Sequence, residues 1–329
     1  MDFRLELDPK PFSEKIEHRH QLMLMGSCFT EQMGSRLAAY KFSTLENPYG
    51  ILFNPISITR AITACLEEKI YEQGDLFFAN ERWNSWDHHS RFSRLSPEET
   101  LLAINDSRGQ ATRFIRQADW LILTLGSAFI YELEDGRPVA NCHKMPSQNF
   151  RKRLMTVEEI LSALDEMIHR VFLKNNKLKI IFTISPVRHL RDGLVENNRS
   201  KAALIQVTHH LVEKFDRLFY FPAYELVVDD LRDYRFYAED MVHPNYLATD
   251  YVWEKFQAAC ISPALPSLFK ELDKINLARK HKPFHPRTGL HQKFLQQTID
   301  KINALSVEFP YLNFSEELEG FRSQLINAS

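Results

Sequence analysis

The chain has 329 residues, of which 44% are hydrophobic and 24 are Phe, so it is long and apolar enough to bury a large core. Its net charge of -2 creates no basic field, which argues against nucleic acid or an anionic membrane as a partner. No stretch approaches the roughly 18 apolar residues that cross a bilayer, and the N-terminus does not resemble a signal peptide. Four cysteines without paired spacing (Cys28, Cys65, Cys142 and Cys260) fit a cytoplasmic protein without disulfides.

The first expected strand, residues 21–25, runs directly into Gly26, Ser27 and Cys28, and a helical pattern then continues to about residue 40. This predicts a tight turn that places the hydroxyl and the thiol at a helix N-terminus. Unpaired N–H groups and the helix dipole there lower the pKa of a thiol, and a nearby base can activate a hydroxyl. The alternative is an ordinary strand–helix junction in which small residues serve packing only.

The rest of the chain alternates helices and strands. We expect an irregular, aromatic segment at 73–92 that forms an ordered loop or a small hairpin, and a hairpin at 129–140 that turns at Asp135-Gly136. Strands alternating with helices indicate parallel βαβ units in a three-layer α/β/α sandwich with a mostly parallel sheet. Helices are expected at 56–70, 96–117, 156–173, 200–215 and 244–259, and further strands at 119–125, 179–184 and 219–228.

Prolines break up a charged, helical sequence after Ser262. We therefore expect a domain over residues 1–262 and a helical C-terminal extension over residues 263–329. The extension packs either on the domain or on a partner subunit, and the sequence leaves the oligomeric state open.

Reactive or flexible residues follow five successive predicted strands. Ligands bind beyond the carboxyl ends of the strands in open parallel sheets, so these residues predict a site on one rim. Asp240 and His243 are three residues apart, which lets the carboxylate hold Nδ1 of the imidazole and leaves Nε2 free as a base. Each of the two also has a structural interpretation: Asp240 as the N-cap of the helix that starts at Pro244, and His243 as a capping or core histidine. The strand ends carry Ser27 and Cys28, then Gly50, Gly126, Ser185, and last Asp240 and His243.

Other histidine and cysteine clusters predict neither a metal nor a cofactor. His88-His89, Cys142-His143 and His209-His210 are adjacent pairs, which is not the ligand spacing of a structural zinc site.

The chain resembles the GSCFA-domain family, a branch of the SGNH/GDSL hydrolase superfamily, over roughly residues 23–261. The resemblance implies a flavodoxin-like sandwich and ester or acyl-transfer chemistry. It is carried by Gly26-Ser27-Cys28-Phe29-Thr30, Asn47-Pro48-Tyr49-Gly50, Leu125-Gly126-Ser127-Ala128, Asn141-Cys142-His143-Lys144, Ser185-Pro186-Val187-Arg188-His189 and Asp240-Met241-Val242-His243-Pro244.

Catalytic roles follow from that resemblance. Asp240 and His243 match the DxxH motif, and Gly50 matches a glycine whose N–H helps to form the oxyanion hole. The superfamily has Gly-Asp-Ser where this chain has Gly26-Ser27-Cys28. If the two are aligned without a gap, Cys28 takes the place of the nucleophile; if the alignment is shifted by one residue, Ser27 does. We favour Cys28.

A second departure concerns the superfamily's Gly-x-Asn block, which is Gly126-Ser127-Ala128 here. Ala128 cannot donate a hydrogen bond, so Asn141 or a backbone N–H would have to do so. His143 would line the cleft beside Asn141 or only anchor its loop.

Arg188 and His189, after the strand that ends at Ser185, would bind an anionic or sugar group or pair with nearby acids. The sequence thus predicts a hydrolase or acyltransferase acting on a small acyl substrate, such as an O-acylated carbohydrate. The alternative is a non-catalytic binding module on a degenerate hydrolase fold.

Overall fold

The computed structural model describes residues 5–325, so the outer ends of the two expected regions, 1–262 and 263–329, lie outside it. Its centre is a five-stranded sheet in the order β10-β9-β5-β1-β2, and every neighbouring pair is parallel. Counted within this sheet alone the order is 2-1-3-4-5, which is the flavodoxin-like arrangement. The strands are β1 (Gln21–Gly26), β2 (Ser43–Glu46), β5 (Trp120–Leu125), β9 (Lys179–Ile184) and β10 (Leu218–Tyr220).

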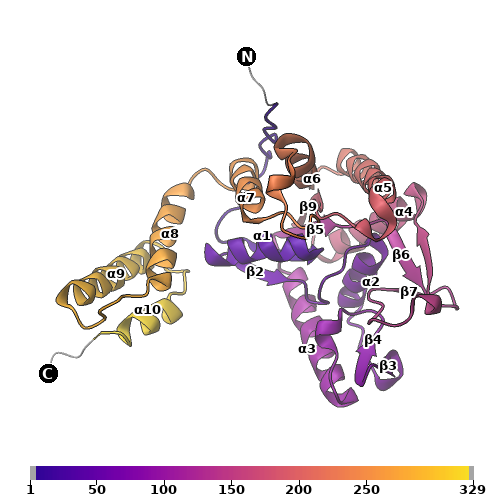
Figure 1. Ribbon diagram of the computed structural model, residues 1–329, viewed down its shortest axis with the longest axis horizontal. Coiled ribbons are helices and arrows are strands. Elements are labelled where there is room, and N and C mark those ends of the chain that lie inside the picture. Colours follow the sequence, from indigo (N-terminus) through magenta and orange to yellow (C-terminus); the bar gives the residue numbers. More distant parts are fainter. Residues whose placement is uncertain (1–4, 326–329) are drawn as a thin grey trace.

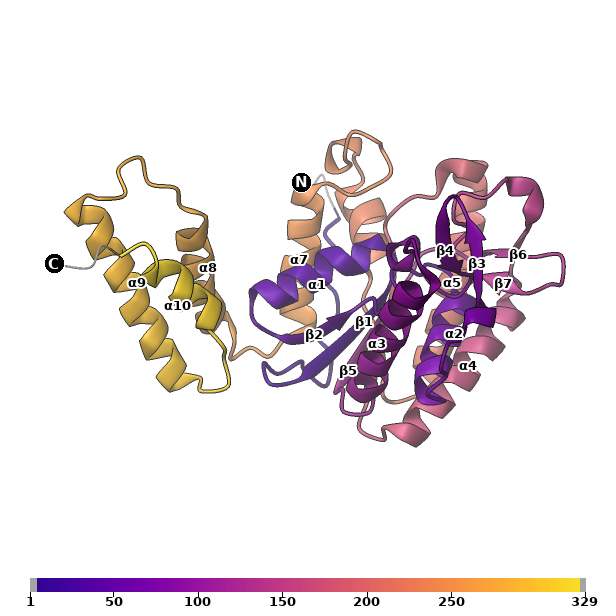
Figure 2. The same cartoon turned by 90° about the horizontal axis from the view of Figure 1, so that it is seen from below.

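Both faces of the sheet are covered, which confirms the three-layer sandwich (Figures 1 and 2). Alternate side chains of β1 enter different cores: Leu22 and Leu24 lie on one face, Met23 and Met25 on the other. One face packs under α1 (Cys28–Ala39) and α7 (Tyr246–Cys260). The opposite face packs under α2 (Pro55–Leu66), α3 (Pro97–Ile115), α4 (Val157–Lys174) and α5 (Gly193–Lys214).

Helix starts follow local chemistry. The Ser96 hydroxyl accepts the N–H of Glu99 at the start of α3, and Thr156 and Glu159 form the expected capping box of α4. Helix α2 ends at Leu66, four residues earlier than expected. Helix α5 begins at Gly193, seven residues before the expected start at 200.

Two small antiparallel sheets lie outside the main one. The first is a hairpin of β3 (Leu76–Ala79) and β4 (Arg82–Ser85), which decides between the two forms expected for this segment, a loop or a small hairpin. The second joins β6 (Phe129–Glu132) to β7 (Pro138–Val139) through the expected turn and adds β8 (Arg151–Leu154) on its other side. Short 3₁₀ helices occupy Gln73–Asp75, Ser90–Phe92, Ser147–Asn149, Leu190–Asp192 and Tyr234–Phe236.

The expected strand over 219–228 is wrong beyond its first residues. Strand β10 ends at Tyr220 because Pro222 has no N–H to donate to a ladder. The chain then forms α6 (Ala223–Glu225) and a π-helix, Leu226–Leu231. Leu226, Val227 and Leu231 bury against the core from this helix rather than from a strand.

The C-terminal helices α8 (Pro266–Lys280), α9 (Gly289–Glu308) and α10 (Ser315–Arg322) form a group at one end of the molecule (Figures 1 and 2). They join the sandwich through the region after α1: the Tyr40 and Phe269 ring centroids lie 4.4 Å apart, and Lys41 forms a 2.9 Å ion pair with Glu317. This confirms the helical extension. Across residues 5–325, no helix has the length and apolar character needed to cross a bilayer.

Candidate active site

The turn after β1 is held in a single conformation. Gly26 has φ +147°, and a Cβ there would lie 2.3 Å from the carbonyl oxygen of Thr124, so only glycine fits. The Gly26 N–H donates to Oδ1 of Asn47 at 2.9 Å, and the Ser27 N–H donates to the Thr124 carbonyl at 3.2 Å. The start of α1 is thus fixed against β2 and β5.

Ser27 and Cys28 have different surroundings. Ser27 is only 3% exposed and is the N-cap of α1, where its hydroxyl accepts the N–H of Phe29 at 3.3 Å. Cys28 is the first residue of the helix and is half-buried. Of the two candidate nucleophiles, Cys28 is therefore the more accessible, whereas the hydroxyl of Ser27 is engaged in capping.

The expected lowering of the Cys28 pKa is wrong. Burial raises the pKa of the thiol above its ordinary value. The N–H groups of Cys28 and Phe29 and, last, the charge of Lys201 act in the opposite direction, but burial, joined by the negative charge of Glu31, outweighs them. The thiol consequently needs a base to become a nucleophile.

Asp240 and His243 form the expected acid–imidazole pair. Oδ2 of Asp240 lies 2.6 Å from Nδ1 of His243, and its Oδ1 accepts the N–H groups of Val242 and His243 at 2.9 and 3.0 Å. The N–H of His243 and the imidazole hold the pKa of Asp240 at about 2. An ionised Asp240 favours the tautomer with the proton on Nδ1, which leaves Nε2 as an acceptor.

The loop after β9 supports the Asp240–His243 turn. The N–H of Arg188 donates to the Val242 carbonyl at 3.2 Å, and the Arg188 guanidinium lies 4.1 Å from the Tyr237 ring centroid. Within residues 5–325, no hydrogen bond joins His243 to Ser27 or Cys28. Their meeting at a common cleft therefore stays a prediction.

Backbone donors near the site are mostly occupied. The N–H groups of Gly126 and Ser127 both donate to the Phe53 carbonyl, and that of Gly50 donates to the Asn47 carbonyl at 2.7 Å. By contrast, no hydrogen bond of the described residues uses the N–H of Cys28, as is normal for the first turn of a helix. That N–H instead acts on the Cys28 thiol, whose ionised form it favours.

Asn141 and His143 make their hydrogen bonds within their own loop and with the β3–β4 hairpin. Oδ1 of Asn141 accepts the His143 N–H at 2.7 Å, and Nε2 of His143 lies 2.9 Å from the Ser85 carbonyl. Among the described residues, neither is hydrogen-bonded to Cys28 or His243. The loop-anchoring interpretation therefore has direct support.

Ser185 and His189 lie in the segment that follows β9. Ser185 is fully buried, and its hydroxyl accepts the N–H of Val187 at 3.3 Å. Nε2 of His189 lies 3.4 Å from where a Cβ on Gly126 would stand, and its ring lies 5.4 Å from that of Phe53. Burial, and next the charge of Lys201, lowers the pKa of His189 to about 4, so the imidazole is neutral at neutral pH.

Sequence reasoning missed three buried polar residues of α5. Asn197, Ser200 and Lys201 are 4%, 2% and 1% exposed and share the buried side of the helix with Leu204. Oδ1 of Asn197 accepts the His189 N–H at 2.9 Å, and Oγ of Ser200 accepts the Ala128 N–H at 2.7 Å. The sequence does carry a signal for them. Residues 197, 200 and 201 have the helical spacing that continues the apolar stripe of 204, 207 and 211, so polar side chains at these positions are expected to be buried.

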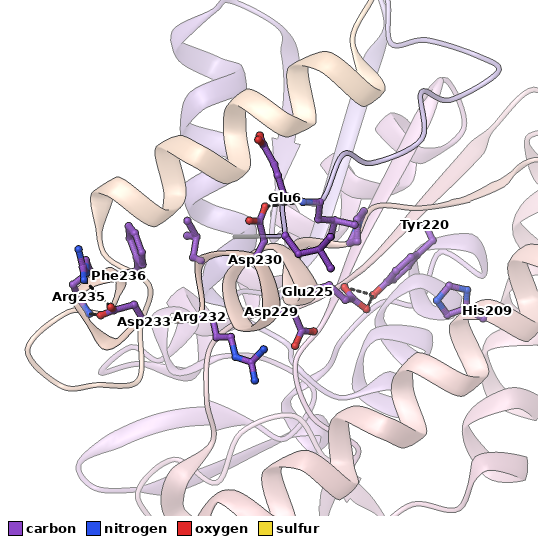
Figure 3. Close-up of a pocket in the computed structure, with 14 residues that line it drawn as sticks. Glu6, His209, Tyr220, Glu225, Asp229, Asp230, Arg232, Asp233, Arg235 and Phe236 are labelled. Carbon is purple, nitrogen blue, oxygen red and sulfur yellow. Dashed lines mark hydrogen bonds and ion pairs between the residues drawn. The ribbon is translucent and has the colours of Figure 1, made fainter. Parts of the chain in front are cut away.

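A large cavity of about 1410 Å³ lies around the end of β10 and the π-helix (Figure 3). Tyr220 forms one wall, where its hydroxyl donates to the Glu225 carboxylate at 2.7 Å. Arg232 and Asp229 extend into the hollow from the π-helix and its end (Figure 3). None of the predicted site residues lines this cavity. In the part of the chain described here, no three His, Cys, Asp or Glu side chains gather closely enough to hold a metal ion.

A comparison of the sequence with known protein families identifies the family that the motifs resemble. The GSCFA family profile covers residues 21–256, which includes β1 and the Asp240–His243 turn. The chain belongs to the GSCFA family. A second profile, the C-terminal domain of GSCFA domain proteins, matches residues 272–327 of this GSCFA protein.

Solved structures similar to this GSCFA protein include a carbohydrate esterase family 3 from Talaromyces cellulolyticus, with 9% identity, a TM-score of 0.35, and coverage of 78% of this chain and 99% of that one. Another is an acetyl esterase mutant with acetate ion, with 10% identity, a TM-score of 0.36 and the same two coverages. A search of curated protein sequences found no match.

Proposed function

We propose that this GSCFA protein is an acyl-ester hydrolase or acyltransferase, with Cys28 as nucleophile and the Asp240–His243 pair as its base. The observation that carries the proposal is the 2.6 Å contact between Asp240 and Nδ1 of His243, which directs the basic Nε2 away from the acid. The half-buried thiol at the start of α1 supplies the second component. The capping role of Ser27 favours Cys28 over Ser27.

The proposed reaction has two steps. Nε2 of His243 takes the proton of the Cys28 thiol as sulfur attacks the acyl carbon, and the resulting oxyanion meets the N–H of Cys28. The C–O bond of the ester then breaks, and His243 returns the proton to the departing alcohol. An acyl thioester remains on Cys28. Water or an acceptor hydroxyl, deprotonated by His243, attacks that thioester and regenerates the thiol.

The proposed substrate is an O-acylated carbohydrate or a similar small acyl compound, and we expect the protein to work in the cytoplasm. Arg188 is the candidate that supports a polar substrate group, because its guanidinium contacts the Tyr234 and Tyr237 rings and its N–H donates to the Val242 carbonyl in the Asp240–His243 turn. Access of water relative to acceptor decides between hydrolysis and transfer.

The test is turnover of a panel of acetyl esters, with acyl-CoA and sugar acceptors added to detect transfer. We expect Cys28→Ala and His243→Gln to abolish turnover, while Ser27→Ala retains it. Cys142→Ser is the matched control, because Cys142 is the other half-buried cysteine and should leave turnover unchanged. The proposal fails if all four variants and the wild type share one background rate.

The alternative is a non-catalytic ligand-binding module on the same fold. It is favoured by the occupied N–H groups of residues 126–128 and by the burial that raises the pKa of Cys28. This alternative predicts a Cys28 that alkylates no faster than a free thiol and an ester turnover that no variant changes.

A further inference from the structure

A lysine is buried below the candidate site without an acidic partner. Lys201 of α5 is 1% exposed, and its Nζ donates to the carbonyls of Gly126 and Ser185, both at 2.6 Å. These carbonyls directly follow the carboxyl ends of β5 and β9. Within residues 5–325, no Asp or Glu forms an ion pair with Lys201. Such a group is costly to bury, and two backbone carbonyls offset that cost only in part.

The Tyr224 ring of α6 lies 5.8 Å from Nζ of Lys201. Cys28 follows Ser27, whose N–H donates to the Thr124 carbonyl two residues before Gly126, so the turn after β1 lies beside the strand end that Lys201 holds. The ammonium interacts electrostatically with the Cys28 thiol and with the His189 imidazole. Of these, the Cys28 thiol is the group whose ionised form an ammonium favours, and the carboxylate of Glu31 on α1 opposes that ionisation. The electrostatic interaction between Lys201 and Cys28 favours the ammonium together with the thiolate.

We propose that Lys201 is a positioning residue of this site, which holds the ends of β5 and β9 together and stabilises the thiolate of Cys28 by its positive charge. This inference rests on the proposed role of Cys28 as nucleophile. It assigns to α5 a contribution that the Asp240–His243 pair cannot supply, because that pair moves the proton but offers no positive charge that favours the thiolate before the reaction.

The neighbours of Lys201 on α5 support a positioning role. Ser200 accepts the Ala128 N–H and lies 3.2 Å from the Ser127 hydroxyl, while Asn197 accepts the His189 N–H. The same face of one helix thus fixes both rim loops, the one after β5 and the one after β9. Lys201 is the charged member of this set.

The proposal has a specific pH signature. Burial lowers the pKa of Lys201 to about 7. Below that pH the lysine is charged and favours the thiolate. Above it the lysine is neutral and this assistance is lost. A merely structural role would change Cys28 reactivity equally at all pH values.

The experiment measures the rate at which an aromatic disulfide reagent modifies Cys28, in full-length protein with Cys142→Ser as the background. At about pH 6, we expect Lys201→Met to react roughly tenfold more slowly than its parent, which corresponds to about one pKa unit of the thiol. At about pH 9, the two rates should converge because Lys201 of the parent has lost its charge. Identical profiles for the folded variant and its parent would overturn the proposal.

Two further variants complete the test. Lys214→Met removes an exposed lysine of the same helix and should leave the profile unchanged. Lys201→Arg keeps its positive charge at all of these pH values, so at about pH 9 its Cys28 should react faster than that of the parent. If Lys201→Met does not fold, this comparison alone decides: an Arg variant that reacts no faster than its parent at about pH 9 overturns the proposal.

Thiol modification requires no substrate, which separates this inference from the proposed function. If ester turnover is absent but the pH signature is present, the proposed function fails and the Lys201–Cys28 coupling stands. If turnover requires Cys28 and the signature is absent, the proposed function stands and the role of Lys201 is overturned.

Discussion

At the scale of single residues, the site depends on a division of roles between two adjacent side chains. Ser27 is buried and caps α1, whereas Cys28 begins the helix and remains half-buried. Their order follows from helix geometry: the N-cap side chain turns back to the N–H groups, and the next side chain projects outward.

Replacing Ser27 by Ala should therefore affect stability before chemistry. The Phe29 N–H would lose its acceptor, and we expect the free energy of unfolding to fall by about 1 kcal/mol, measured by urea denaturation. Ser35→Ala, on the exposed side of the same helix, is the control and should change little. A Ser27→Ala protein of unchanged stability would show that the cap contributes nothing.

Asp240 should titrate well below an ordinary aspartate. Its pKa of about 2 arises first from the His243 N–H and then from the imidazole. Because the folded-state pKa is lowered, the stabilisation by this group is complete above its unfolded pKa, about 4, and is lost as the pH falls toward 2.

Carboxyl NMR titration checks this in the wild type and in His243→Ala. The variant keeps the backbone N–H but loses the imidazole, so the midpoint should rise part of the way toward the ordinary value. A midpoint that does not move would show that the imidazole contributes nothing to the ionisation of Asp240.

At the scale of elements, α5 and the π-helix differ most from what the sequence predicted. One face of α5 fixes the loops after β5 and β9 through Asn197, Ser200 and Lys201. The apolar run after β10 looks like a strand because a short buried segment carries the same composition in either conformation. Pro222 and the neighbouring helices decide against the strand.

Removing the Ser200 hydroxyl should loosen the loop after β5. In Ser200→Ala, the Ala128 N–H stays buried without an acceptor, which should cost about 1–3 kcal/mol of unfolding free energy. Denaturant unfolding measures this, with Gln206→Ala on the exposed side of α5 as control. Equal stabilities of the two variants would contradict the role given to Ser200.

At the scale of the whole molecule, the C-terminal helices share a core with the sandwich. Phe269 of α8 is 4% exposed and packs against Tyr40 and Phe42, which follow α1. The buried Glu317 of α10 pairs with Lys41 and with Arg279 of α8. Contacts of this kind couple the extension to the end of the helix that begins at Cys28.

Phe269→Ala should therefore destabilise the sandwich as well as the C-terminal helices. We expect a loss of about 3–5 kcal/mol, with one unfolding transition reported by both far-UV and aromatic signals. Phe284→Ala is the control, because Phe284 is 98% exposed. Two separate transitions in the Phe269 variant would show that the extension and the sandwich unfold independently.

The sequence by itself determined the order of the main elements, the turn at Gly26-Ser27-Cys28 and the Asp240–His243 pair. These depend on interactions within a few residues: buried apolar runs, helix caps, a glycine-specific turn and a three-residue spacing. Only the tertiary structure decided that burial raises the pKa of Cys28, that the 126–128 N–H groups are occupied, and that Lys201 lies below the rim. Those properties depend on side chains from strands and helices far apart in the chain, because burial and hydrogen-bond partners exist only once the sheet has assembled.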